Sequence, residues 1–143
     1  FVLFVLAMIL GPVHTLAKER DEVRTEHVRE LMTKILQLEL IDPEAYARLI
    51  DDVGAQAELV SVIGQGSCGG SSGKYCQAEV TAEHCLNLAD YFSPLLLASQ
   101  PVDPRNDVYS EAATGYYLAI KDNELEVGAC GAAGEPIVLR KSF

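Results

Sequence analysis

Residues 1–10 are FVLFVLAMIL, an unbroken apolar run, and residues 18–30 are KERDEVRTEHVRE, a densely charged one. Apolar residues then return at the spacing of one face of a helix, i, i+3, i+4, i+7 and i+8. They are Val28, Leu31, Met32, Ile35 and Leu36. The pattern predicts one helix from the first residues to about residue 40, with an apolar half and an amphipathic half. At 1.5 Å per residue it would be about 60 Å long and would project well beyond a domain of this size.

Two interpretations of residues 1–17 are open from the residues alone. A helix that crosses a bilayer needs about 20 apolar residues. This segment is cleanly apolar only over residues 1–10, and Gly11, Pro12, His14 and Thr15 follow. Its proportions are typical of the hydrophobic region of a signal peptide, with residues 15–17 (TLA) as a small-residue cleavage site before Lys18. The alternative is an apolar anchor retained in the mature protein.

Length and charge restrict the class of protein. The chain has 143 residues, which suits one globular head over residues 18–143 and an apolar arm over residues 1–17. Hydrophobic residues make up 49% of it, which is enough for a small core. The net charge is −10 and all charged side chains follow position 17, so the head is strongly acidic. We therefore expect no direct contact with nucleic acid, whose phosphates such a surface repels.

The rest of the chain predicts an α+β head. Asp42 and Pro43 form an N-cap signal before EAYARLIDDV (residues 44–53), a second helix. Residues 64–74, GQGSCGGSSGK, form a loop by composition, and residues 81–97 have the apolar content of a further helix. YYLAIK (116–121) and ELEV (124–127) predict two strands joined by a tight turn, and IVLR (137–140) a third, with Tyr116 and Tyr117 on opposite faces.

The four cysteines are Cys68, Cys76, Cys85 and Cys130. Their spacing fits no zinc motif, so we expect no metal site from them. An even number of cysteines behind an apolar N-terminus favours disulfides formed outside the cytoplasm over buried free thiols. Three pairings are possible, and we favour Cys68–Cys76, which closes the loop, with Cys85–Cys130.

Three motifs suggest chemistry, and each has a simpler structural explanation. GQGSCG (residues 64–69) matches the dinucleotide pattern G-x-G-x-x-G, but GSSGKY is a poor helix start, so we expect no cofactor. His84 and Cys85 point about 100° apart on a helix, which disfavours a thiol nucleophile. Asp103, Asn106 and Asp107 have oxygen ligands for calcium, although a turn explains them equally well. We expect no catalytic residues.

The two ends of the chain resemble a known family. A Phe at the start of an apolar segment that leads into a charged helix ending ILQLEL (residues 35–40) resembles the N-terminus of type IV pilins and pseudopilins. The stretch CLNLADYFSPLLLASQPVDPRND (85–107), with its Pro-Val-Asp-Pro turn, is similar to the globular half of bacterial pilins. TGYYLAIKDNELEVGACG (114–131) is similar to their Tyr-rich hairpin that ends near a cysteine.

The resemblance implies a ladle-shaped fold, in which a protruding helix packs through its second half on a small C-terminal antiparallel sheet. The protein would then be a structural filament subunit and not an enzyme. Phe1 would be the N-terminus exposed by a prepilin peptidase and then methylated. Gly11 and Pro12 would mark the place where this helix loosens on assembly. The polymerisation arm would consist of Phe1, Val2, Leu3, Phe4, Val5, Leu6, Met8, Ile9, Leu10, Gly11 and Pro12.

One position departs from the family pattern. Most major pilins have a glutamate at the fifth mature position, thought to pair with the N-terminal amine of a neighbouring subunit, whereas this chain has Val5. The first carboxylate in the chain is that of Glu19. An unpaired ammonium in an apolar core is costly. Another group must meet that amine, or the subunit has a special position in the filament, or the mature chain starts elsewhere.

The expected partners are identical or homologous subunits in a helical filament, with the inner membrane and the assembly machinery before that. The expected location is the inner membrane first and then an extracellular filament on the cell surface. The alternative function is a small secreted, disulfide-stapled binding protein whose signal peptide is cleaved after Ala17.

Overall fold

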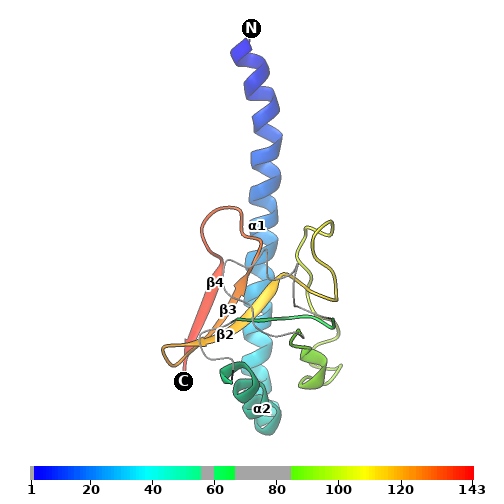
Figure 1. The fold of residues 1–143 in the computed structure, drawn as a ribbon, viewed down its shortest axis with the longest axis vertical. Helices are drawn as coiled ribbons and strands as arrows, with labels where there is room; N and C mark the ends of the chain where they lie inside the picture. The colour runs from blue at the N-terminus through cyan, green and yellow to red at the C-terminus, as the bar shows by residue number, and fades with distance from the viewer. Residues whose placement is uncertain (1, 56–59, 67–84) are drawn as a thin grey trace.

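A single long helix organises the molecule. The structure is a computed structural model that describes the backbone of residues 2–55, 60–66 and 85–143, and the side chains in these ranges from residue 15 onward. Helix α1 (Val2–Ile41) runs for 40 residues without a break, about 60 Å at the rise of an α-helix. Its first half projects from the head, and its second half crosses the head to the far end (Figure 1). The predicted single helix is confirmed.

The second half of α1 is held by one apolar stripe. Each of its buried members stands three or four residues from another member, which places them on one face of the helix. They are Val28, Leu31, Met32, Ile35 and Leu38, all at most 7% exposed. The polar residues on the opposite side of the helix are exposed or half-buried: Arg29, Glu30, Thr33, Lys34 and Gln37. Hydrophobic patterning therefore identified the packed face of α1 correctly.

Helix α2 (Pro43–Gly54) begins where the sequence predicts it. Asp42 is the N-cap, and its Oδ1 atom accepts a hydrogen bond from the backbone N–H of Ala45 at 3.0 Å. Pro43 occupies the first turn, where its missing N–H costs nothing. Ala45, Leu49 and Val53 face the core, so α2 folds back against the end of α1 and closes that end of the head.

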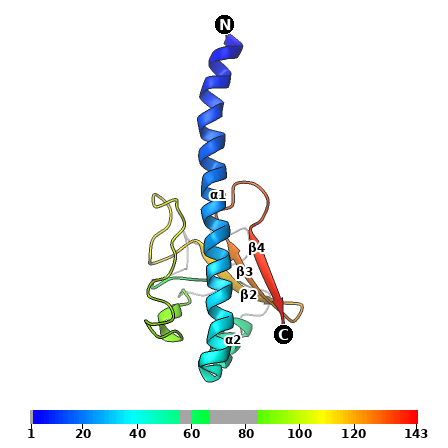
Figure 2. The ribbon, with the colours of Figure 1, turned by 180° about the vertical axis from the view of Figure 1, so that it is seen from behind.

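The sheet has four antiparallel strands in the order β1-β2-β3-β4. They are β1 (Ser61–Val62), β2 (Tyr116–Lys121), β3 (Glu124–Ala129) and β4 (Val138–Ser142). Asp122 and Asn123 join β2 to β3 with φ values of 51° and 64°, the conformation of a tight two-residue hairpin turn. Seen from behind, α1 runs across one face of the sheet (Figure 2). The predicted α+β class and the three C-terminal strands are confirmed.

Alternation along β2 separates the two tyrosines as predicted. Tyr116 is fully buried, and its hydroxyl lies 2.7 Å from Nδ1 of His27 on α1. Tyr117 faces the other side of the sheet, where its hydroxyl donates a hydrogen bond to Glu126 at 2.9 Å. One face of the sheet thus packs on α1, and the opposite face bears polar groups.

The sequence predicts a helix over residues 81–97. Residues 81–84 lie outside the described residues, and for residues 85–97 the prediction is wrong. Leu86 forms a parallel bridge with Ile63, and only η1 (Leu88–Asp90) is helical, as a short 3₁₀ turn. The side chain of Asn87 accepts a hydrogen bond from the N–H of Ala89, which competes with a continuous helix. Buried Leu88 and Phe92 produced the apolar signal.

Gly115 provides a test of the turn that leads into β2. Its φ is +84°, and a Cβ there would lie 2.8 Å from the ring of Tyr109 and 2.9 Å from Cβ of Asp103. We expect Gly115→Ala to lower the free energy of unfolding by about 2–4 kcal/mol, from backbone strain and overpacking together. Urea unfolding followed by circular dichroism measures it. Gly134→Ala is the control, because a Cβ at position 134 would lie 3.9 Å from its nearest neighbour, Asp21. Equal stability of the two variants would refute the argument.

Candidate assembly interface

The part of α1 that leaves the head is exposed as far as its side chains are described. Residues 15–20 are all exposed except Ala17, which is half-buried. Leu16 is 51% exposed and Val23 is 40% exposed, although both are large and apolar. They stand seven residues apart, two helical turns, and so lie on the same face of α1. The charged residues Glu19 and Arg20 stand between them on this face and are also exposed, so the two apolar side chains are isolated from each other.

The predicted polymerisation arm lies at the projecting end of this helix. Phe1 lies outside the described residues, and the other predicted arm residues belong to α1. The helix continues through Gly11 and Pro12. The loosening expected at these two residues concerns the assembled filament and stays a prediction. Among the described residues, no helix combines the length and the apolarity needed to cross a membrane.

A buried ion pair joins α1 to the head at the point where the helix enters it. Arg24 is 1% exposed, and its guanidinium donates to both carboxylate oxygens of Asp103, at 2.7 Å from Nε and 3.0 Å from Nη2. Nη1 donates to Asp21 at 2.7 Å. Asp21 in turn accepts from the backbone N–H of Ala133, in the connection between β3 and β4. Arg24 and Asp21 together thus connect the helix to two loops of the head.

This ion pair was not predicted, although the sequence contains a signal for it. Arg24 stands four residues before Val28, in phase with the buried stripe of α1, and a charge in that position requires a buried partner. Burial by itself lowers the pKa of Arg24, but the hydrogen bonds to Asp103 and Asp21 outweigh it and raise the pKa, so the guanidinium stays charged. Which carboxylate meets it depends on tertiary structure, since Asp103 is 79 residues away.

The other candidate motifs have structural roles where they are described. Both oxygens of Asp103 bind Arg24, and Asp107 pairs with Arg105, so this turn presents no open set of calcium ligands. No group of three or more potential ligands lies together in the part of the chain that the structure describes. The N–H groups of Gly64, Gln65 and Gly66 all donate to backbone carbonyls, which removes them as phosphate donors.

The cysteines are only partly described. Cys85 and Cys130 are both disulfide-bonded, and both pack beside Val62 of β1. Cys68 and Cys76 lie outside the described residues, as does His84. The pairing of Cys68 with Cys76 and of Cys85 with Cys130 stays a prediction. A disulfide at Cys85 leaves it no thiol to act as a nucleophile.

Comparisons with models of known families, with curated proteins and with solved structures find no match to this chain. A functional assignment therefore depends on the geometry of α1 and on the residues of the two ends. That geometry is a helix whose first half projects from the head and whose second half is packed in it (Figure 1).

Removing the charge of Asp103 tests the ion pair. Asp103→Asn leaves Arg24 buried with only Asp21 as a charged partner, and we expect it to lower the free energy of unfolding by about 3 kcal/mol. Urea titration of the full chain in a neutral detergent measures this. Asp107→Asn serves as the control, because its pair with Arg105 is solvent-exposed and should leave stability unchanged. An Asp103→Asn variant as stable as this control would contradict the role of the pair.

Proposed function

We propose that this chain is a structural subunit of a type IV pilus-like filament and polymerises through the apolar first half of α1. The observation that carries the proposal is the division of this helix. It continues without interruption for 40 residues, while the buried stripe that holds it to the head begins only at Arg24 and Val28. The projecting half is thus presented to other molecules on a stiff support.

The composition of the projecting half indicates what must cover it. Residues 1–10 are all apolar, and the first charged side chain is Lys18. Burying a large apolar side chain contributes about 1.5–3 kcal/mol relative to leaving it in water. A lipid bilayer can supply the cover before assembly, and the arms of neighbouring subunits can supply it in the filament core.

The architecture of the head also supports the proposal. The second half of α1 packs on a small antiparallel sheet near the C-terminus, an arrangement that fits the ladle shape expected of a pilin. The Pro-Val-Asp-Pro turn (residues 101–104) and the hairpin of β2 and β3 are the segments on which the family resemblance rests. Asp103 in that turn holds the arm-bearing helix in the head, which gives the turn a mechanical role in a filament.

The remaining assignments follow from this proposal. Its partners are identical or homologous subunits, with the inner membrane and the assembly machinery before polymerisation. Its location is the inner membrane and then the extracellular filament. The head is acidic, so contact of this subunit with nucleic acid is the least favoured of the possible filament functions. Because residue 5 is valine, a group other than a carboxylate at the fifth position must pair with the N-terminal amine of the neighbouring subunit.

The mature N-terminus separates the proposal from its alternative. Mass analysis of the protein purified from its cells should find a chain that begins at Phe1 with a methylated amine. The alternative, a secreted binding protein, requires cleavage after Ala17 and a chain that begins at Lys18. A Lys18 start would remove the entire polymerisation arm and with it the proposed function.

Substitution in the arm tests polymerisation directly. Leu6→Asp or Ile9→Asp places a carboxylate where the filament core would be, which is costly without a partner. We expect either variant to abolish filaments in electron micrographs while the head keeps its circular dichroism spectrum. Leu40→Asp is the matched control, because Leu40 lies near the other end of α1 and is 84% exposed. Normal filaments from the arm variants, or equal loss in the control, would exclude assembly through the arm.

A further inference from the structure

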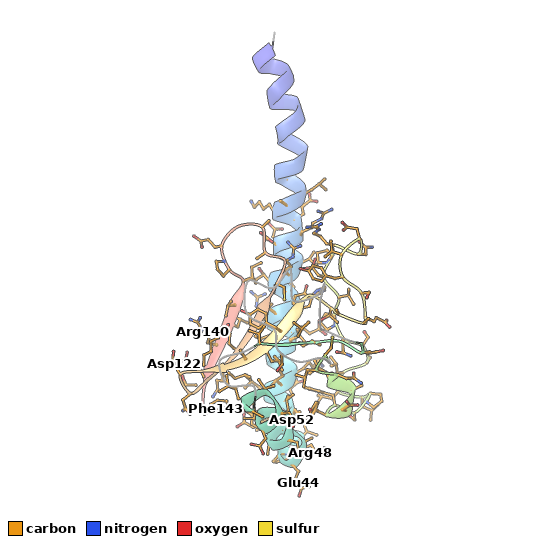
Figure 3. All side chains as sticks on the ribbon, in the orientation of Figure 1. Glu44, Arg48, Asp52, Asp122, Arg140 and Phe143 are labelled. Atoms are coloured by element: carbon orange, nitrogen blue, oxygen red, sulfur yellow. The ribbon has the colours of Figure 1, made fainter. Side chains whose placement is uncertain are left out.

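A groove of about 310 Å³ lies between α1 and the edge strand β4. Thr25, Val28 and Arg29 of α1 form one wall, and residues 135–139 form the other. The connection that leads into β4 lies beside α1 on the arm side of the head (Figure 1). Figure 3 shows Phe143, beyond the last residue of β4, towards the end of the head where α2 lies. The groove, at the start of β4, is therefore on the arm side.

The bottom of the groove is apolar. Leu139 pairs in register with buried Val127, so its side chain is on the face of the sheet that packs on α1. Ile137, two residues earlier, packs against the same core, and Pro136 precedes it in the wall. Leu139 nevertheless remains 39% exposed. The groove thus leaves accessible an apolar surface that a partner could cover.

The charged side chains around the groove do not select a charged ligand. Arg29 pairs with Glu26 of its own helix, and the two side chains are 59% and 71% exposed. Glu135, in the other wall, is exposed to water as well. Solvated charges of this kind contribute little to binding. An uncharged, apolar occupant therefore matches the groove better than an anion or a cation.

The chain itself contains a segment with these properties. Residues 1–17 have no charged side chain, and residues 1–10 are all apolar. The arm of the same molecule cannot fill the groove, because α1 is continuous over 40 residues and the arm projects away from the head (Figure 1). A second helix beside α1, at an axis distance of about 8–10 Å, would lie over the groove. The occupant that fits is the arm of another copy.

We propose that the groove between α1 and β4 receives the apolar arm of a second copy of this chain. This inference rests on the proposed filament function and adds to it a binding site for the arm on the head. Arm and groove are different surfaces, so the contact is heterologous, and each subunit donates its arm to one neighbour and receives that of another. A heterologous contact whose rotation does not close a ring produces a helical filament.

Cross-linking from position 139 tests which segment covers the groove. A diazirine-bearing amino acid replaces Leu139 in the full chain, filaments sheared from the cells are irradiated, and the joined peptides are identified by mass spectrometry. We expect cross-links to residues 1–17. Leu95 is the control position, because it is 99% exposed and does not line the groove, and it should give no cross-link to the arm. Cross-links from position 139 only to another head, to lipid or to a different protein would overturn the proposal.

A charge in the groove tests its contribution to assembly. Leu139→Glu places a carboxylate where the arm would pack, and we expect the yield of filaments to fall about tenfold or more. The circular dichroism spectrum of the head should not change, because Leu139 is already partly exposed. Leu139→Met should keep a normal yield, since it preserves an apolar side chain. Leu95→Glu makes the same charge change outside the groove, and a yield equal to that of Leu139→Glu would refute the proposal.

The outcomes separate failure of the groove from failure of the filament proposal. Normal filaments from Leu139→Glu, together with loss of filaments in Leu6→Asp, would exclude the groove and leave assembly through the arm intact. Absence of filaments from the unaltered chain would exclude both. Loss of filaments in both variants, with cross-links from position 139 to the arm, would support both.

Discussion

The structure depends on the packing of one helical stripe against one face of a sheet. The stripe on α1 is covered by β2 and β3, and it consists of Val28, Leu31, Ile35 and Leu38. The strands depend on this contact because their side chains that face α1, among them Tyr116, Leu118 and Val127, are apolar and would otherwise be exposed to water. Helix α2 and the segment around Leu88 close the sides of the same core. Every other feature is placed relative to this contact.

The Arg24–Asp103 pair adds direction to that contact. Apolar packing resists separation of helix and sheet but is poorly directional, whereas a guanidinium bound at two nitrogens by one carboxylate fixes position and angle. The pair lies where α1 leaves the head, so it determines how the projecting half is oriented. Gly115 and Tyr109 pack beside Asp103 and keep that carboxylate in place. A buried pair of this kind is better explained by specificity of geometry than by net stability.

The two halves of α1 have different surroundings. Side chains of the second half contribute to the core of the head, whereas the first half projects from the head (Figure 1). Assembly into a filament would use the first half without disturbing the second, because the buried stripe begins only at Arg24 and Val28.

The sequence by itself determined the elements that depend on local periodicity and on short-range caps. The long helix, the Asp42 cap of α2, the Asp122–Asn123 turn and the separation of Tyr116 from Tyr117 all follow from neighbouring residues. The helix predicted over residues 81–97 failed because apolar content indicates burial but does not specify conformation, and Leu86 joins Ile63 instead. The apolar arm of the candidate interface was evident from composition. Tertiary structure alone decided that Arg24 meets Asp103 and that Tyr117, Lys121 and Arg140 surround Glu126. These partners come from separate segments, and only the registry of helix, strands and loops brings their charges within reach.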